Sequence, residues 1–149
     1  MAGDDAVFID TNVLVYAKLA KAPLHAQAAE QLRDLDKQGV ELWIARQTLR
    51  EYLSAMTRPG SFTEPIPISS LADDVRHFAE RFRVAEDGDQ VTERLLQLLM
   101  HVPAGGKQIH DANIVATMLA YGISRLLTHN VGDFRRYAHL IEVIPLVQL

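Results

Sequence analysis

The chain has 149 residues, of which 48% are hydrophobic and 23% charged, and we expect one folded domain over residues 1–149. Its formal net charge of −4 argues against a protein that binds nucleic acid through a broad basic face. The lack of cysteine excludes disulfides, thiolate metal sites and a cysteine nucleophile. An acidic N-terminus without a long apolar run predicts a cytoplasmic protein that does not contact a membrane.

Short apolar runs alternate with amphipathic stretches, beginning with Val7-Phe8-Ile9, which predicts a buried strand. Further strands are predicted over residues 40–44, 83–85, 125–128 and 141–144. Helices are predicted over residues 13–20, from after Pro23 to about 38, and over 46–57, 68–82, 91–100, 109–121 and 131–137. Residues 58–67 contain three prolines and a glycine and predict a surface loop. This order indicates an α/β fold, a five-stranded parallel sheet flanked by helices on both faces.

Polar side chains follow two of the predicted strands. Asp10 comes directly after the first strand, and Asn130 and Asp133 follow the fourth. The carboxyl ends of parallel strands share one edge of the sheet, which is where ligands bind in open α/β folds. Helix capping is the competing explanation, because Asp10 can cap the next helix and Asn130 with Asp133 resembles a capping box. Thr11 or Asn12 can also cap the first helix, which would leave Asp10 free for a ligand.

Two further acids lie on predicted helices. Glu51 sits at the margin of an apolar stripe, where solvated surface is the ordinary interpretation of a glutamate. Asp111 falls in the first turn of an almost wholly apolar helix, where the helix dipole favours it. A carboxylate at the buried start of a core helix also needs compensation, and a cation supplies it. Several oxygen ligands without cysteine or a histidine-rich set favour Mg²⁺ or Mn²⁺.

Four segments together resemble the motifs of the PIN-domain family, and specifically VapC-type toxins of type II toxin–antitoxin systems. In order, they are Phe8–Ala17, Gln47–Leu53, His110–Ala116 and Leu127–Phe134. The resemblance implies a PIN-like three-layer sandwich with metal-dependent endoribonuclease activity. Asp10, Glu51 and Asp111 match the family's acidic positions.

The fourth acidic position is less direct. Many PIN proteins carry an acid where this chain has Asn130, whereas Asp133 matches the other acid of that motif. We therefore expect Asp133 to contribute the charge and Asn130 to act as a polar ligand or a cap. Thr11, Asn12 and Thr128 are expected to orient the ligands by hydrogen bonding.

The implied reaction is hydrolysis of an RNA phosphodiester by a water that one or two Mg²⁺ or Mn²⁺ ions activate. Asp10 and Asp111 are the expected principal ligands, and Asp133 completes the second metal position. Glu51 holds a metal-bound water or acts as the base. We assign capping of the first helix to Asn12 or Thr11. Tyr16, like Trp43 and Tyr52, is interpreted as a core aromatic residue.

The resemblance also implies partners, namely an RNA substrate, a cognate antitoxin and a second copy in a homodimer. The helix over residues 68–82 is a candidate for partner contact and equally for ordinary cover of the core. The alternative function is a PIN-like domain that binds RNA or a protein without catalysis. A haloacid-dehalogenase-type phosphatase would need an acid at Asn12, and a response-regulator receiver would need one after the strand that ends at Ile44.

Overall fold

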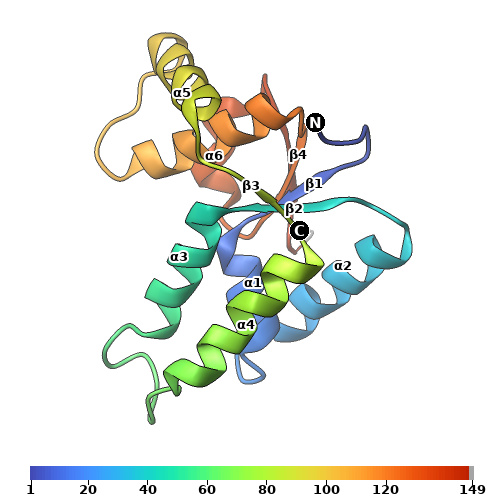
Figure 1. The fold of residues 1–149 in the computed structure, drawn as a ribbon, viewed down its shortest axis with the longest axis vertical. Helices are drawn as coiled ribbons and strands as arrows, with labels where there is room; N and C mark the ends of the chain where they lie inside the picture. Colours follow the sequence, from blue (N-terminus) through green and yellow to red (C-terminus); the bar gives the residue numbers. More distant parts are fainter. Residues whose placement is uncertain (148–149) are drawn as a thin grey trace.

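The computed structural model describes residues 1–147, and its centre is a parallel sheet (Figure 1). The strand order is β3-β2-β1-β4-β5, and every neighbouring pair is parallel. The strands are β1 (Val7–Ile9), β2 (Leu42–Ala45), β3 (Arg83–Ala85), β4 (Arg125–Thr128) and β5 (Glu142–Pro145). The predicted five-stranded parallel sheet is therefore confirmed.

Helices cover both faces of this sheet (Figure 1). They are α1 (Thr11–Lys18), α2 (His25–Lys37), α3 (Arg46–Met56), α4 (Ile68–Arg81), α5 (Asp89–His101), α6 (Gln108–Tyr121) and the 3-10 helix η1 (Val131–Tyr137). One face carries α1 to α4, and the other carries α5, α6 and η1. In the described part of the chain, no helix is long and apolar enough to cross a membrane.

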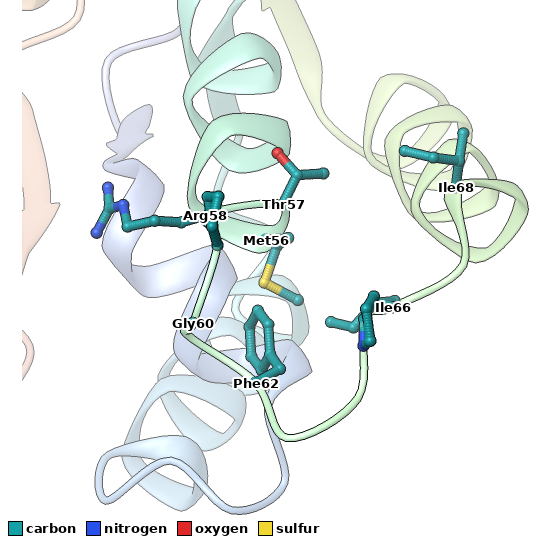
Figure 2. Close-up of a pocket in the computed structure, with 9 residues that line it drawn as sticks. Met56, Thr57, Arg58, Gly60, Phe62, Ile66 and Ile68 are labelled. Atoms are coloured by element: carbon teal, nitrogen blue, oxygen red, sulfur yellow. The ribbon is translucent and has the colours of Figure 1, made fainter.

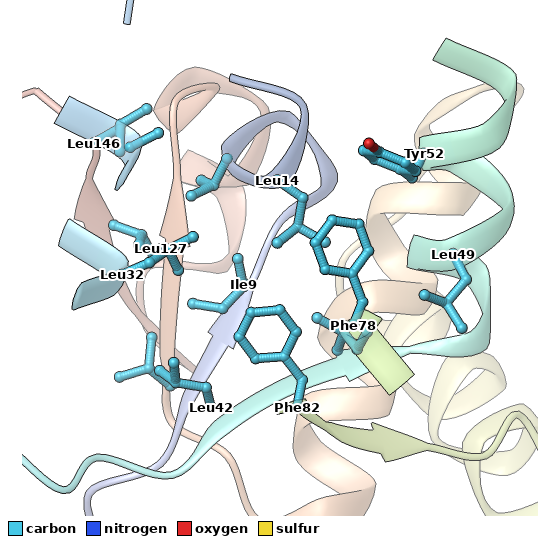
Figure 3. Packing of buried hydrophobic residues seen from close by; sticks show 14 of the residues in the cluster. Ile9, Leu14, Leu32, Leu42, Leu49, Tyr52, Phe78, Phe82, Leu127 and Leu146 are labelled. Atoms are coloured by element: carbon cyan, nitrogen blue, oxygen red, sulfur yellow. The ribbon is translucent and has the colours of Figure 1, made fainter. Parts of the chain in front are cut away.

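Side chains along each strand point alternately to the two faces of the sheet, and this divides the core into two clusters. Val7 and Ile9 pack under α1 to α4, whereas Phe8 points to the opposite face and packs with α5 and α6. Successive side chains of a strand point to opposite faces, so an all-apolar strand feeds both clusters at once. Figure 3 shows the first cluster, in which Phe78 and Phe82 close over the strands.

The start of the first helix differs from the prediction. The helix begins at Thr11 rather than Val13, and Asp10 is its N-cap, since Thr11 N–H donates to Asp10 Oδ1 at 2.8 Å. Assigning the cap to Asn12 or Thr11 was therefore wrong. The carboxylate has two oxygens, so one of them can cap the helix while the other contacts the neighbouring strand.

Two other predicted elements also differ. The run after β4 is a 3-10 helix, and the Asn130 side chain makes no capping hydrogen bond to it, so the capping-box explanation was wrong. The second strand starts at Leu42 rather than Val40. Residue 40 instead closes the end of α2, where its N–H donates to Leu35 O at 3.1 Å.

The predicted loop over residues 58–67 lies between α3 and α4 and encloses an apolar hollow of about 270 Å³. Met56, Phe62 and Ile66 face one another in it (Figure 2). Arg58 extends away from its apolar centre (Figure 2). On α4, Leu71 and Phe78 are buried while Ile68 is 66% exposed, so this helix does cover the core.

Candidate active site

Asp10 lies at the carboxyl end of β1, beside the end of β4. Three donors satisfy its buried carboxylate: Thr11 N–H at Oδ1, and Thr128 Oγ1 and Asn12 Nδ2 at Oδ2, at 2.7 and 3.1 Å for the last two. Asn12 also accepts from the His129 N–H at 3.1 Å through its side-chain oxygen. These bonds hold Asp10 in one orientation across the junction of two strands.

Glu51 reaches the same place from α3. Its side chain is half-buried, and Thr11 Oγ1 donates to its Oε1 at 3.1 Å. Thr11 therefore serves two acids, because its N–H binds Asp10 while its hydroxyl binds Glu51. Glu51 points into the site, although a helical glutamate in isolation is usually solvated surface.

The four predicted acids border one cleft of about 390 Å³ at the carboxyl edge of the sheet. Its lining comprises Asp10, Thr11, Asn12, Val15, Tyr16, Glu51, Ala55, Arg58, Asp111, Asn130 and Asp133. Asn130 and Asp133 both line it, so the structure brings together both candidates for the fourth position. Thr128 is fully buried and does not line the cleft, but its hydroxyl donates to Asp10 and accepts from the Asn130 N–H at 3.0 Å.

The acids raise one another's proton affinity. Burial raises the pKa of Asp111 to about 6, and the charges of Asp133, Asp10 and Glu51 add to that rise. Burial also raises the pKa of Asp10, against its hydrogen bonds, and the pKa of Glu51. Burial and like charges both disfavour a carboxylate, so this cleft is repulsive for four anions without a cation.

The donor chemistry suits a hard divalent cation. Within residues 1–147, no three His, Cys, Asp or Glu side chains already lie close enough together to hold an ion by themselves. Mg²⁺ typically keeps several waters and takes only one or two carboxylates, so a wide, all-oxygen site fits it. The mutual repulsion of the acids adds a second reason for a cation. The residues present therefore fit Mg²⁺ or Mn²⁺.

Two further residues, Tyr16 and Arg58, line the cleft. Tyr16 is half-buried and packs against the apolar cluster under α1 to α4, as predicted for a core aromatic residue, but it also lines the cleft and packs edge-to-face with His129, with ring centroids 5.7 Å apart. Its position four residues after Asn12 was the available signal, because one helical turn returns to the same face. Arg58 follows α3, and no local pattern directs it to the cleft.

Comparison with known proteins identifies the family. The model of the PIN domain matches residues 7–140, which include all four acids. The chain therefore belongs to the PIN-domain family, whose members are nucleases. Comparison with curated protein sequences gave no match.

Solved structures share the fold. VapBC2 from Rickettsia felis, bound to a DNA fragment from its promoter, is 19% identical with a TM-score of 0.69, covering 94% of this chain and 98% of that one. FitAcB from Neisseria gonorrhoeae is 15% identical, with a TM-score of 0.66 and coverage of 96% and 99%. VapC20 from Mycobacterium tuberculosis, described as a sarcin-ricin loop cleaving toxin, is 17% identical, with a TM-score of 0.65 and coverage of 94% and 100%.

Proposed function

We propose that this chain is a metal-dependent endoribonuclease and the toxin of a type II toxin–antitoxin pair. The observation that carries the proposal is the gathering of Asp10, Glu51, Asp111 and Asp133 around one cleft, where burial and like charge raise the pKa values of the first three. Strongly perturbed acids in a cleft mark a functional site more often than a structural one. Membership of a nuclease family agrees with this assignment.

One or two Mg²⁺ or Mn²⁺ ions would acidify the attacking water and neutralise charge on the scissile phosphate. Asp10 and Asp111 are proposed to hold the metal, with Asp133 or Asn130 completing the site. Asp10 suits this role because three donors already orient its carboxylate. A fixed carboxylate has little freedom left to lose when it binds a cation.

Glu51 is the proposed base. Its raised pKa brings it closer to neutral pH, where a carboxylate takes a proton from water most effectively. The hydroxyl of Thr11 holds one of its oxygens in place. Attack by water with the 3′-oxygen leaving produces 5′-phosphate and 3′-hydroxyl ends.

The proposed partners are an RNA substrate, a cognate antitoxin and a second copy in a homodimer, all in the cytoplasm. The description of VapC20 as a toxin that cleaves the sarcin-ricin loop supports RNA as the substrate class. A structure described as a toxin–antitoxin complex from Klebsiella pneumoniae supports an antitoxin partner, because it shares the fold of this chain with a TM-score of 0.64 at 19% identity.

The direct test compares Asp10→Asn with Asp87→Asn in the purified protein. Asp87 follows β3 at the same edge of the sheet but is exposed and does not line the cleft, which makes it a matched control. With Mg²⁺ or Mn²⁺ present, RNA cleavage is expected to fall at least about 100-fold in Asp10→Asn and to stay unchanged in Asp87→Asn.

Full cleavage by a folded Asp10→Asn variant, or cleavage that persists in EDTA, would contradict the proposal. RNA binding by the wild-type protein without cleavage under any divalent metal would favour the non-catalytic alternative.

A further inference from the structure

A pair of side-chain amides connects α3 with the first turn of α6. Gln47 is only 7% exposed, its Nε2 donates to the His110 carbonyl at 3.2 Å, and its Oε1 accepts from Asn113 Nδ2 at 3.1 Å. Both polar ends of the buried side chain are therefore satisfied, and both partners belong to the helix that carries Asp111.

Gln47 lies at the junction of two separately packed layers. The α3 residues Leu49 and Tyr52 belong to the apolar cluster on one face of the sheet, whereas Ile114 and Val115 of α6 belong to the cluster on the other face. The α3 helix packs mainly on α1, and α6 packs mainly on α5. The apolar contacts thus position each helix within its own layer, and the amide bonds run from one layer to the other.

The acids of the cleft sit next to this connection. Glu51 is four residues after Gln47 and so lies on the same face of α3. Asp111 lies between His110 and Asn113, so the two hydrogen bonds of Gln47 bracket it along α6. The carboxylates of Glu51 and Asp111 repel one another, which tends to push the two helices apart.

We propose that Gln47 is a positioning residue that sets the spacing of Glu51 and Asp111 for metal binding by holding α3 to the first turn of α6. The inference rests on the proposed metal-dependent activity.

The chemistry of the amide explains why glutamine suits this position. Its nitrogen donates to a carbonyl and its oxygen accepts from another amide, so it satisfies both partners without adding charge. A glutamate would place one more negative charge beside an acidic cleft. A lysine or arginine would offer Asn113 no acceptor, and a leucine would leave two polar groups of α6 without this partner.

The test compares Gln47→Leu with Thr117→Val. Thr117 is 2% exposed on α6, and its hydroxyl donates to the Asn113 carbonyl at 2.7 Å, so its variant also loses one partly buried hydrogen bond near Asn113 but keeps the connection to α3. Mn²⁺ affinity is measured by calorimetry, RNA cleavage by kcat and KM, and folding by thermal denaturation.

Gln47→Leu is expected to weaken Mn²⁺ binding and lower kcat by about 10- to 100-fold each, the usual effect of removing a residue that orients metal ligands. KM for RNA should change little, and Thr117→Val should stay within about 2-fold of wild type in Mn²⁺ affinity. Wild-type Mn²⁺ affinity in a folded Gln47→Leu variant overturns the proposal. An equal loss of affinity in Thr117→Val also overturns it.

A second pair of variants covers the case in which Gln47→Leu does not fold. Gln47→Asn shortens the side chain by one methylene and retains the amide, and adding Asn113→Gln restores the combined length. Recovery of Mn²⁺ affinity in the double variant supports the connection, whereas losses that simply add oppose it. Absence of Mn²⁺ binding and of cleavage in the wild-type protein would instead refute the proposed function itself.

Discussion

Acidic side chains at the two ends of the central strands have opposite environments. Glu41, just before β2, accepts from Trp43 Nε1 at 2.7 Å and from the Gly3 N–H at 3.2 Å, and Arg83 lies 3.8 Å away. The hydrogen bond from Trp43 is the main cause of its lowered pKa. At the carboxyl end, burial and neighbouring acids raise the pKa of Asp111 to about 6.

A raised pKa is not a general property of acids at the carboxyl edge of the sheet. Glu86 follows β3 at the carboxyl edge, yet its pKa is lowered because Arg46 hydrogen-bonds to it, at 2.8 Å for the shorter contact. Hydrogen-bond donors and arginines thus stabilise Glu41 and Glu86 outside the cleft, whereas the cleft acids repel one another. Uncompensated charge of this kind costs stability and is typical of functional sites.

The largest expected effect comes from substituting one acid in each of the two environments, Asp111 in the cleft and Glu41 just before β2. Asp111→Asn should lower RNA cleavage at least about 100-fold, because it removes a proposed metal ligand, whereas Glu41→Gln should leave cleavage unchanged. The same two substitutions should have opposite effects on the stability of the metal-free protein. Without metal at pH 7, thermal denaturation should show Asp111→Asn to be more stable than wild type and Glu41→Gln to be less stable.

Divalent metal should change the order of stability of the three proteins. At a Mn²⁺ concentration about 100 times its Kd, the free energy of unfolding should rise by about 2.7 kcal/mol in wild type and in Glu41→Gln. Asp111→Asn should lose most of that gain. An equal Mn²⁺ stabilisation of all three proteins would show that the cleft acids do not hold the metal.

A smaller effect extends the comparison to two buried tyrosines. Tyr52 donates its hydroxyl proton to Asp74 Oδ2 at 2.6 Å, whereas the Tyr137 hydroxyl has no hydrogen-bond partner among the described residues. Tyr52→Phe should therefore lower the free energy of unfolding by about 1–2 kcal/mol. Tyr137→Phe should be neutral or slightly stabilising. Urea denaturation of both variants measures the difference, and equal losses would contradict it.

The smallest expected effect is on the pH dependence of stability. Asp111 binds its proton more tightly in the folded chain than in the unfolded chain, so its contribution favours folding at low pH. That contribution is lost as the pH rises from about 4 to about 6. The melting temperature of the metal-free protein, taken relative to Asp111→Asn, should fall over this range. Solvent screening limits its size, because Asp111 is only half-buried.

Local patterns predicted most of the fold. Strand Val7–Ile9 and the long apolar helix that ends at Tyr121 follow from the spacing of hydrophobic residues, which depends on near neighbours in the chain. The starts of β2 and α1 differ from the prediction, because the ends of an element depend on which polar group finds a partner. The gathering of Asp10 and Asp133 at one edge was predictable because parallel strands share their carboxyl ends.

The sequence by itself determined the order of elements, the parallel sheet and the four acids. Only the tertiary structure decided that Asp10 caps α1 and also binds Thr128, which is 118 residues away. The same holds for Gln47, whose partners are 63 and 66 residues distant. Hydrogen bonds over such separations leave no periodic signal in the sequence, because their partners meet only when the layers of the fold come together.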